Sequence, residues 1–193
     1  MIYFTADTHF GSEKVRIYSL RPFVNLRQMD KIMIKNWNKT AKKDDYIYHL
    51  GDFGSYNTIK KLKGKVILIM GNYEVNDKER DFKSFKSYKK YLLSLGFYDV
   101  IDERGLRKIF KDISDEEIYL THKPMDCDPN CFNLFGHIHG HSRAKDFGLN
   151  VGVDCYNYKL VTVENINFLK KAIDEKIFDD NVFCQKSNLI NKK

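Results

Sequence analysis

Short apolar runs, each bounded by polar or turn residues, recur along the chain and constrain its fold more than any other feature. Runs such as "IYFTA" at 2–6 and "VILIM" at 66–70 have the length and the β-branched and aromatic content of strands. Several are too continuously apolar for a strand with one solvated face, which indicates a sheet covered on both faces. The nine predicted strands are "IYFTA", "YIYHL", "VILIM", "YDVI", "LRKIF", "EIYLT", "CFNLF", "LNVGV" and "LVTV".

A helical pattern over 29–40 separates the first two predicted strands. Its apolar residues recur on one stripe and its lysines on another, at the three- and four-residue spacings of a helix. We interpret the lysine row as a solvated helix face, with the steering of phosphate groups as the alternative. The apolar stripe consists of Met29, Ile32, Met33 and Trp37, and the lysine row of Lys31, Lys35 and Lys39.

Further helices are predicted at 56–64, ending at Gly64 as a C-cap, within 80–95 before Gly96, and at 164–183 before a polar tail. Strands alternate with helices over the first 70 residues, which is typical of parallel α/β units, and the denser strand signals after 97 indicate a second, more antiparallel sheet. The predicted fold class is α/β (α+β), with two packed mixed β-sheets flanked by helices. We expect a single domain over 1–165, with 166–193 forming a C-terminal helix and polar tail of the same domain.

Composition excludes several classes of protein. Hydrophobic residues make up 42% and charged residues 31% of the chain, which argues against wholesale disorder. No apolar run approaches the roughly 18 residues that span a bilayer, and the first residues lack the basic start and long apolar run of a secretory signal. These features predict a cytoplasmic protein with no membrane partner and with reduced cysteines. The net charge of +7 favours anionic partners.

Metal-capable side chains follow five of the predicted strands at the point where each strand ends. Because ligands bind outside the carboxyl ends of strands in open α/β sheets, we expect these side chains to line one crevice. Four of the six histidines belong to this set, and the other two, His49 and His141, lie within three residues of it, which argues against coincidence. The set comprises Asp7 and His9, then Asp52, Asn72 and His122, then His137 and His139.

The spacing of these residues suggests how they converge. In an extended segment residues i and i+2 project to the same side, so each Asp-x-His or His-x-His pair is expected to converge on one point. Glycines precede Asp52, Asn72 and His137, where they allow a sharp turn or a close approach to a bound group. Two carboxylates, one amide oxygen and four imidazoles suit two divalent ions that share a carboxylate. This donor set favours Mn²⁺, Fe or Zn²⁺ over Ca²⁺ or Mg²⁺.

The ordered set resembles the motifs of the calcineurin-like metallophosphoesterases, in particular the small bacterial and phage members. The family motifs run D-x-H, G-D, G-N-H-[DE], a single His and G-H-x-H, and this chain reads "ADTHFG", "HLGDFG", "MGNYEV", "LTHKPM" and "FGHIHG". The resemblance covers about positions 2 to 163, including "RPF" at 21–23 and "NVGVD" at 150–154. It implies an αββα metallophosphoesterase sandwich with a dinuclear site. One ion would be held by Asp7, His9, Asp52 and His139, and the other by Asp52, Asn72, His122 and His137.

The resemblance also implies a chemistry. A dinuclear metal-dependent phosphoesterase of this kind hydrolyses a phosphodiester or nucleotide by attack of a metal-bridging hydroxide, with Asp52 as the bridging carboxylate. The implied cofactors are two divalent metal ions, Mn²⁺ first, with Fe, Zn²⁺ or Ni²⁺ as alternatives. The implied partner is a phosphate-ester substrate, either a nucleotide or a nucleic acid, and the oligomeric state stays open.

Two residues depart from the family pattern: Ser12 stands where close relatives often have another His, and Tyr73 stands where the motif has the His that protonates the leaving group. A phenol is a poor proton shuttle at neutral pH, and loss of a positioned acid typically costs about 10²–10⁴ in rate. Three interpretations stay open: another acid acts, for which His141 and His49 are candidates; the change inactivates the enzyme; or the site is kept for binding. The alternative function is therefore a catalytically impaired pseudo-phosphoesterase that binds a phosphorylated ligand or partner.

Overall fold

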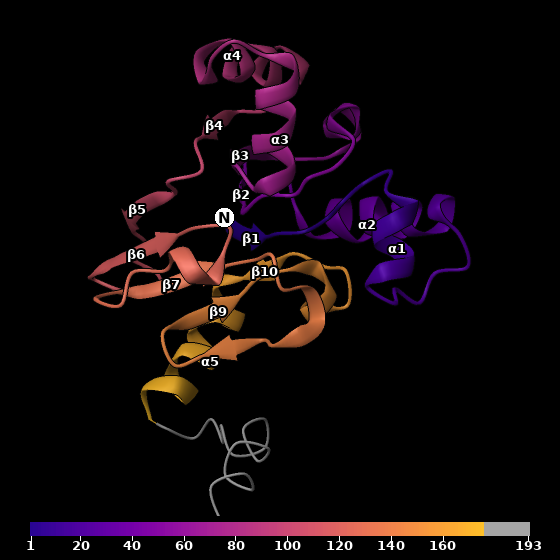
Figure 1. Cartoon of the computed structure of the whole chain (residues 1–193). Coiled ribbons are helices and arrows are strands. Elements are labelled where there is room, and N and C mark those ends of the chain that lie inside the picture. The colour runs from indigo at the N-terminus through magenta and orange to yellow at the C-terminus, as the bar shows by residue number, and fades with distance from the viewer. Residues whose placement is uncertain (176–193) are drawn as a thin grey trace, which may run out of the picture.

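The computed structural model describes residues 1–175 and contains two five-stranded sheets (Figure 1). In the first sheet three of the four strand pairs are parallel, and the edge strand that comes last in the chain is antiparallel to the first strand. This confirms the prediction of parallel α/β units in the first part of the chain. The strands are β1 (Ile2–Thr5), β2 (Tyr46–His49), β3 (Lys65–Ile69), β4 (Asp99–Ile101) and β10 (Val161–Thr162), in the order β10-β1-β2-β3-β4.

The second sheet is mixed, with two parallel and two antiparallel pairs. Its larger antiparallel share agrees with the strand signals after 97. Together the two sheets confirm the predicted sandwich of two mixed sheets flanked by helices. The strands are β5 (Leu106–Ile109), β6 (Glu117–Leu120), β7 (Phe132–Phe135), β8 (Ala144–Lys145) and β9 (Gly148–Asn150), in the order β5-β6-β7-β9-β8.

Most helices begin at a side chain that accepts a backbone N–H of the first turn. Ser12, Asn25, Ser84 and Thr162 act in this way, which satisfies donors that a helix start leaves unpaired. None of the helices in residues 1–175 is long and apolar enough to cross a bilayer. The helices are α1 (Glu13–Tyr18), α2 (Leu26–Thr40), α3 (Asn72–Asp81), α4 (Phe85–Leu95) and α5 (Val163–Asp174), with 3₁₀ turns η1 (Tyr56–Lys61), η2 (Pro124–Asp126), η3 (His139–His141) and η4 (Val153–Tyr156).

The segment 56–64 forms only the 3₁₀ turn η1, so the predicted helix with a C-cap at Gly64 was wrong. Side chains of α2 bind the backbone that another helical turn would need. Asn38 accepts the N–H of Lys63 at 2.8 Å, and the Trp37 indole N–H donates to the Lys63 carbonyl at 2.8 Å. These tertiary hydrogen bonds replace the local ones and end the helix early.

Two other predicted boundaries also differ. The sequence pattern gave no helix directly after β3, yet α3 begins there at Asn72. The helix predicted within 80–95 is α4, and Gly96 ends it with a φ of 122°. The C-terminal helix predicted over 164–183 is α5, which begins at Val163. Its predicted continuation past 175, the polar tail at 184–193 and Cys184 lie outside the described residues.

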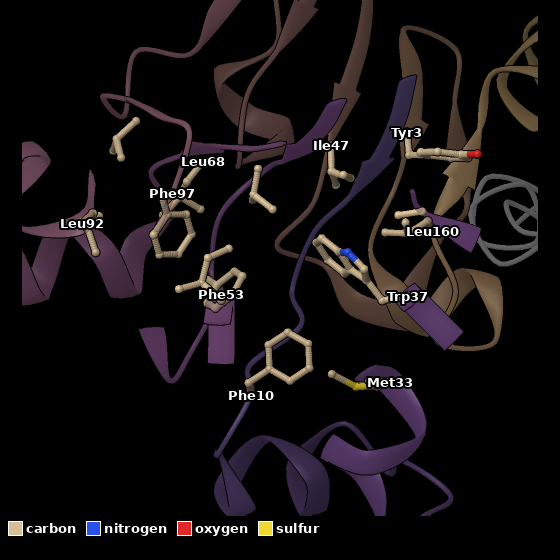
Figure 2. Packing of buried hydrophobic residues seen from close by; sticks show 14 of the residues in the cluster. Tyr3, Phe10, Met33, Trp37, Ile47, Phe53, Leu68, Leu92, Phe97 and Leu160 are labelled. Atoms are coloured by element: carbon tan, nitrogen blue, oxygen red, sulfur yellow. The ribbon is translucent and has the colours of Figure 1, made fainter. Parts of the chain in front are cut away.

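Buried side chains form two clusters on opposite faces of the first sheet. Residues alternate along β2, where Ile47 belongs to the cluster beneath α2 and α4, and Tyr48 belongs to the cluster shared with the second sheet. Figure 2 shows the first cluster, in which Trp37 and Met33 of α2 point toward the sheet. Since both faces of the first sheet are covered, its functional side chains are confined to the strand ends.

The second cluster generates a test of this packing. Phe4 is fully buried, stacks on Tyr48 at 5.6 Å between ring centroids and meets the edge of Phe110 at 5.2 Å. We expect Phe4→Ala to lower the free energy of unfolding by about 3–5 kcal/mol in urea titrations, because the lost ring leaves a cavity between the sheets. Phe168→Ala is the matched control, since Phe168 is 75% exposed on α5, and should change stability by about 0.5 kcal/mol or less. Equal losses in both variants would contradict the assigned packing.

Candidate metal centre

The seven predicted site residues lie together at one edge of the sandwich, where strands of both sheets end. The first sheet contributes the residues that follow β1, β2 and β3, and the second sheet contributes those that follow β6 and β7. The centre opens into a cavity of about 630 Å³. Five of the seven residues line this cavity: His9, Asp52, Asn72, His137 and His139.

The backbone at most of these positions is left-handed, so the expectation of extended i, i+2 pairs was wrong. Asp7 and His9 do share one group of ligand atoms, but His137 and His139 belong to different groups. Left-handed backbone at a residue with a side chain costs roughly 1–2 kcal/mol and is concentrated at functional sites. The φ angles are 55° at Asp7, 47° at His9, 58° at Asp52, 72° at His137 and 48° at His139.

The first group brings Asp7, His9 and His139 together, with their ligand atoms within 4.8 Å of one another. Both Asp7 oxygens accept the backbone N–H of His137, at 3.0 and 2.9 Å. Both ring nitrogens of His9 are buried without a hydrogen-bond partner, and burial lowers the pKa of this imidazole to about 2. A buried, neutral imidazole with a free lone pair is a ready metal ligand, and leaving it unpartnered would cost about 1–3 kcal/mol.

The second group is a triangle of acceptor atoms. The Asn72 Oδ1 lies 3.0 Å from His122 Nε2 and 3.0 Å from His137 Nδ1, and the two imidazole nitrogens are 3.2 Å apart. The His122 Nδ1–H donates to the Leu50 carbonyl at 2.7 Å, so its Nε2 carries no proton. The triangle therefore holds at most one proton for three lone pairs. A cation among the three atoms removes their mutual repulsion.

Asp52 belongs to the second group together with His122 and His137, and it also faces the first group. Its Oδ2 is 3.4 Å from His9 Nε2 and 3.6 Å from His122 Nε2. Its Oδ1 accepts the backbone N–H of Tyr73 at 3.0 Å. Burial raises the pKa of Asp52, and the nearby Glu74 carboxylate raises it further. One carboxylate oxygen facing an imidazole of each group is the arrangement that the family resemblance implies for a shared ligand.

Glu74 supports this geometry, although the sequence analysis gave it no role. It is fully buried, and its carboxylate accepts three backbone N–H groups, from Asp52 and Gly71 at 2.8 Å and from Phe53 at 2.9 Å. These bonds join the end of β2 to the start of α3, so Asn72 is placed by a helix N-terminus and not, as predicted, by the strand itself. The sequence signal that could have identified Glu74 is its place at the acidic position of the family motif, in "GNYE".

Arg21 and Asp154 support the first group in a similar way. The Arg21 guanidinium donates two hydrogen bonds of 2.9 Å to the Asp154 carboxylate and one of 2.6 Å to the Asp7 carbonyl. The Asp154 Oδ2, which accepts one of these bonds, also lies 2.9 Å from His139 Nδ1. The buried pair thus orients the imidazole of His139 and fixes the backbone at Asp7. Both residues belong to segments, "RPF" and "NVGVD", that the sequence analysis quoted without a role.

Of the three residues considered for proton transfer, two line the cavity and one does not. Tyr73 is 38% exposed at the cavity, with its ring at 4.8 Å from the His9 ring between centroids. His141 is exposed and lines the same cavity. His49 is fully buried beneath α2, where its Nε2 pairs with Thr8 Oγ1 at 2.9 Å, so its candidacy as a proton donor was wrong. The His49 ring points into the first cluster because successive side chains of β2 still alternate between the two faces of the sheet at this position.

The donor set fits two divalent ions. The unpartnered nitrogens of His9, the acceptor triangle around Asn72 and the central carboxylate of Asp52 are all explained by cations at the two groups. Ligand atoms bonded to one ion at about 2.1 Å and near right angles lie about 3 Å apart, which is the spacing within the triangle. Nitrogen and oxygen donors without a thiolate agree with Mn²⁺, Fe, Zn²⁺ or Ni²⁺.

Comparisons with known proteins place the chain beside relatives of unknown function. No known family profile matches it. The uncharacterized protein MJ1445 of Methanocaldococcus jannaschii is 35% identical over 100 residues, which are 48% of this chain and only 57% of that protein's length. The crystal structure of AQ665 from Aquifex aeolicus, a protein of unknown function, has a TM-score of 0.61 and 26% identity over 88% of this chain and 98% of its own. Phosphopantetheinyl hydrolase from Mycobacterium tuberculosis overlaps 62% of this chain and 40% of its own at a TM-score of 0.30 and 14% identity, too little to carry an inference.

The support from Glu74 leads to a prediction about metal affinity. We expect Glu74→Gln to weaken Mn²⁺ binding at least about tenfold in calorimetric titrations, because an amide accepts through one oxygen only and its NH₂ faces backbone donors. Glu79→Gln, at an exposed position of the same helix, is the control and should bind Mn²⁺ as the wild type does. Unchanged affinity in Glu74→Gln would show that the carboxylate does not set the geometry.

The buried carboxyls predict how stability depends on pH. Burial raises the pKa of Asp7 and Asp52, so each favours the fold when protonated, and that contribution is lost as the pH rises through the raised pKa. His9 and His122 have lowered pKa values and act the opposite way, but only at and below their ordinary range near pH 6.5. We therefore expect the Tm of the chelated protein to fall from about pH 7 to about pH 9.

The same experiment includes the metal. Bound Mn²⁺ keeps both carboxylates charged, so the metal-loaded protein should show little of this fall and the metal-induced rise in Tm should grow with pH. A double Asp7→Asn, Asp52→Asn variant should lose most of this pH dependence even with a chelator present, and the remainder should come from Glu74, whose pKa burial also raises. A metal-induced rise in Tm that is the same at both ends of this pH range would contradict the account.

Proposed function

We propose that this protein is a dinuclear metal-dependent phosphoesterase that hydrolyses a phosphodiester or nucleotide. The observation that carries the proposal is the acceptor triangle of Asn72, His122 and His137, which adjoins the first group through the Asp52 carboxylate. Because the acceptor triangle has three lone pairs and at most one proton, its atoms would bind a cation favourably. The open cavity beside it leaves room for a substrate.

Each residue has a defined part in this proposal. Asp7, His9 and His139 would hold one ion, Asn72, His122 and His137 the other, and Asp52 would contact both. Two such ions, when bound, neutralise phosphoryl charge and acidify a water so that it can attack at neutral pH. Mn²⁺ is the first choice for both positions, with Fe, Zn²⁺ and Ni²⁺ as alternatives.

The residues at the cavity wall act on the substrate directly. The Lys14 ammonium lies on the wall and attracts the anionic ester into the cavity. The Tyr73 phenol donates a hydrogen bond to an ester oxygen without giving up its proton, so it orients the substrate more than it protonates the leaving group. His141 lines the same cavity and is the alternative acid; a Tyr73→His variant no faster than the wild type on an alkoxide substrate would assign the proton to it.

Tyr73 also supports the second candidate function, a pseudo-phosphoesterase that binds a phosphorylated ligand without turnover. Its exposed ring at the cavity would contact a ligand whether or not hydrolysis follows.

A cytoplasmic location is part of the proposed function, since the three described cysteines are free thiols, as in a reducing compartment.

The proposal predicts turnover of bis(4-nitrophenyl) phosphate in the presence of Mn²⁺, lost with EDTA and in Asp52→Asn. We expect Tyr73→His to accelerate hydrolysis of a dinucleotide, whose alkoxide leaving group needs a proton, by about a hundredfold, and the aryl ester by much less. Tyr73→Phe controls for packing of the ring. Tight binding of the dinucleotide with no turnover of either ester would favour the pseudo-phosphoesterase and overturn the enzyme.

A further inference from the structure

Most of the chain's positive charge is concentrated in one segment. Positions 26–65 contain ten lysines and arginines against four aspartates, a net charge of +6 out of the +7 of the whole chain. The other positions of 1–175 contain 19 basic and 20 acidic residues. Such an asymmetry indicates an anionic partner at this part of the surface.

The segment folds so that its cations gather on one surface, here called the basic face. The lysine row of α2 lies opposite the buried apolar stripe, and Asn38 on the same helix donates to the Lys61 carbonyl at 2.7 Å and accepts the Lys63 N–H at 2.8 Å. The end of η1 is therefore bound alongside α2. The basic face consists of Arg27, Lys31, Lys35, Lys39, Lys61 and Lys63, all exposed.

Within the described residues, no carboxylate forms an ion pair with a cation of the basic face, because the acids of the segment are engaged elsewhere. Asp44 pairs with Lys65, and the buried Asp45 pairs with the terminal ammonium at 2.7 Å. Asp30 accepts the N–H of Gly11. Burial raises the pKa of the Asp30 carboxyl, and the nearby charge of Lys61 lowers it by a smaller amount. The positive charge of the face is thus available to a partner.

The basic face approaches the candidate metal centre at the start of α2, whereas Lys39 and Lys63 lie toward the edge where β2 and β3 begin. The loop that follows β1 and carries His9 reaches α2 through the hydrogen bond from Gly11 to Asp30. Figure 1 places α1, whose Lys14 lines the cavity of the centre, beside α2. A hollow of about 530 Å³ lies on the face, lined by Leu26, Arg27, Asp30, Lys31, Ile34 and Lys61.

We propose that the basic face binds the phosphate backbone of a nucleic acid, and that a strand held there supplies the phosphodiester that the candidate centre hydrolyses. The second half rests on the proposed function, and the first does not. Lysines four residues apart rise about 6 Å along a helix, comparable with the spacing of neighbouring phosphates in one strand. Contacts of this kind read the backbone and not the base sequence.

Two features favour a nucleic acid over other anionic partners. Among the described residues, the large hydrophobic side chains that are exposed include none from 26–65, whereas a helix that lies in a membrane surface needs such side chains to enter it. Five of the six cations are lysines, a residue depleted at protein–protein interfaces but common at phosphate contacts. The aliphatic walls of Leu26 and Ile34 in the hollow suit sugars that lie beside the phosphates.

The test measures binding and turnover in the same variants. One variant carries Lys31→Gln, Lys35→Gln and Lys61→Gln. The control carries Lys83→Gln, Lys86→Gln and Lys90→Gln, which remove the same charge from exposed positions at α4. Fluorescence anisotropy with labelled 20-nucleotide RNA and DNA, single- and double-stranded, is recorded in EDTA across a salt series. Turnover of bis(4-nitrophenyl) phosphate is measured with Mn²⁺.

We expect the first variant to bind nucleic acid at least about tenfold more weakly, with the slope of log K against log[salt] reduced by about 2, and the control to bind as the wild type does. Turnover of the small ester should be unchanged in both. Equal losses in both variants, or binding to anionic vesicles but to no nucleic acid, would overturn the basic face as a nucleic-acid site.

The two proposals fail separately. Wild-type turnover of the small ester together with unaltered nucleic-acid binding in the first variant would reject the basic face and leave the phosphoesterase standing. Weakened binding in that variant without any turnover in the wild type would reject the phosphoesterase and leave a nucleic-acid-binding face. Cleavage of the labelled strand with Mn²⁺ that the first variant loses and the control retains is the result expected if both hold.

Discussion

The geometry of the candidate centre depends on one buried carboxylate. Glu74 accepts backbone N–H groups from both sides of the gap between β2 and α3, and so fixes the distance between the Asp52 loop and Asn72. A charge this deeply buried is unfavourable unless it is fully hydrogen-bonded, which the three donors provide. Both His9 ring nitrogens are left without a hydrogen-bond partner, and the triangle atoms of Asn72, His122 and His137 contact one another. The fold satisfies its own polar groups with Glu74, Asp154 and Arg21, and leaves the lone pairs of the ligands exposed to a cation.

The sandwich and the strand ends were predictable from the sequence because they follow from local rules. Continuous apolar runs identify buried strands, and the first polar residue after each run lies at the carboxyl edge of its sheet. The spacing of His137 and His139 wrongly suggested one shared point, whereas the family resemblance implied different ions for them; their separation depends on left-handed backbone at both residues, which spacing does not reveal. In the loop after β1, the left-handed backbone is held by hydrogen bonds between distant residues, such as the one from the His9 N–H to the Asp52 carbonyl at 3.0 Å. No local sequence pattern encodes such bonds.

The supporting residues were harder to predict than the ligands for a similar reason. A buried acid such as Glu74 looks like any helical Glu in sequence, and only its three backbone partners, two of them more than 20 positions away, give it a role. The 3₁₀ turn η1 likewise has the composition of a helix, and tertiary bonds from Asn38 and Trp37 shorten it. The same hydrogen bonds place Lys61 and Lys63 beside the lysine row of α2. The sequence suggests only a solvated helix face for this row, but in the structure the row is part of a larger basic surface.

Many departures from regular backbone geometry and hydrogen bonding lie near the same edge of the molecule, although left-handed Asn157 and the unpartnered Nδ1 of His49 do not line the cavity. Left-handed residues, unpartnered imidazoles and a tyrosine in place of the family's histidine surround one cavity, and the basic face leads toward it. Strain and unpaired polar groups persist where a bound ligand compensates for them. Metal ions at the candidate centre would account for the backbone strain, and a nucleic acid on the basic face would account for the charge distribution.

The most direct test of the central claim is anomalous diffraction from crystals of the protein grown with Mn²⁺. The account predicts two peaks per chain, one bordered by Asp7, His9 and His139 and one by Asn72, His122 and His137, with the Asp52 carboxylate in contact with both. A single peak, a peak bound by other residues, or no peak at saturating Mn²⁺ would contradict it.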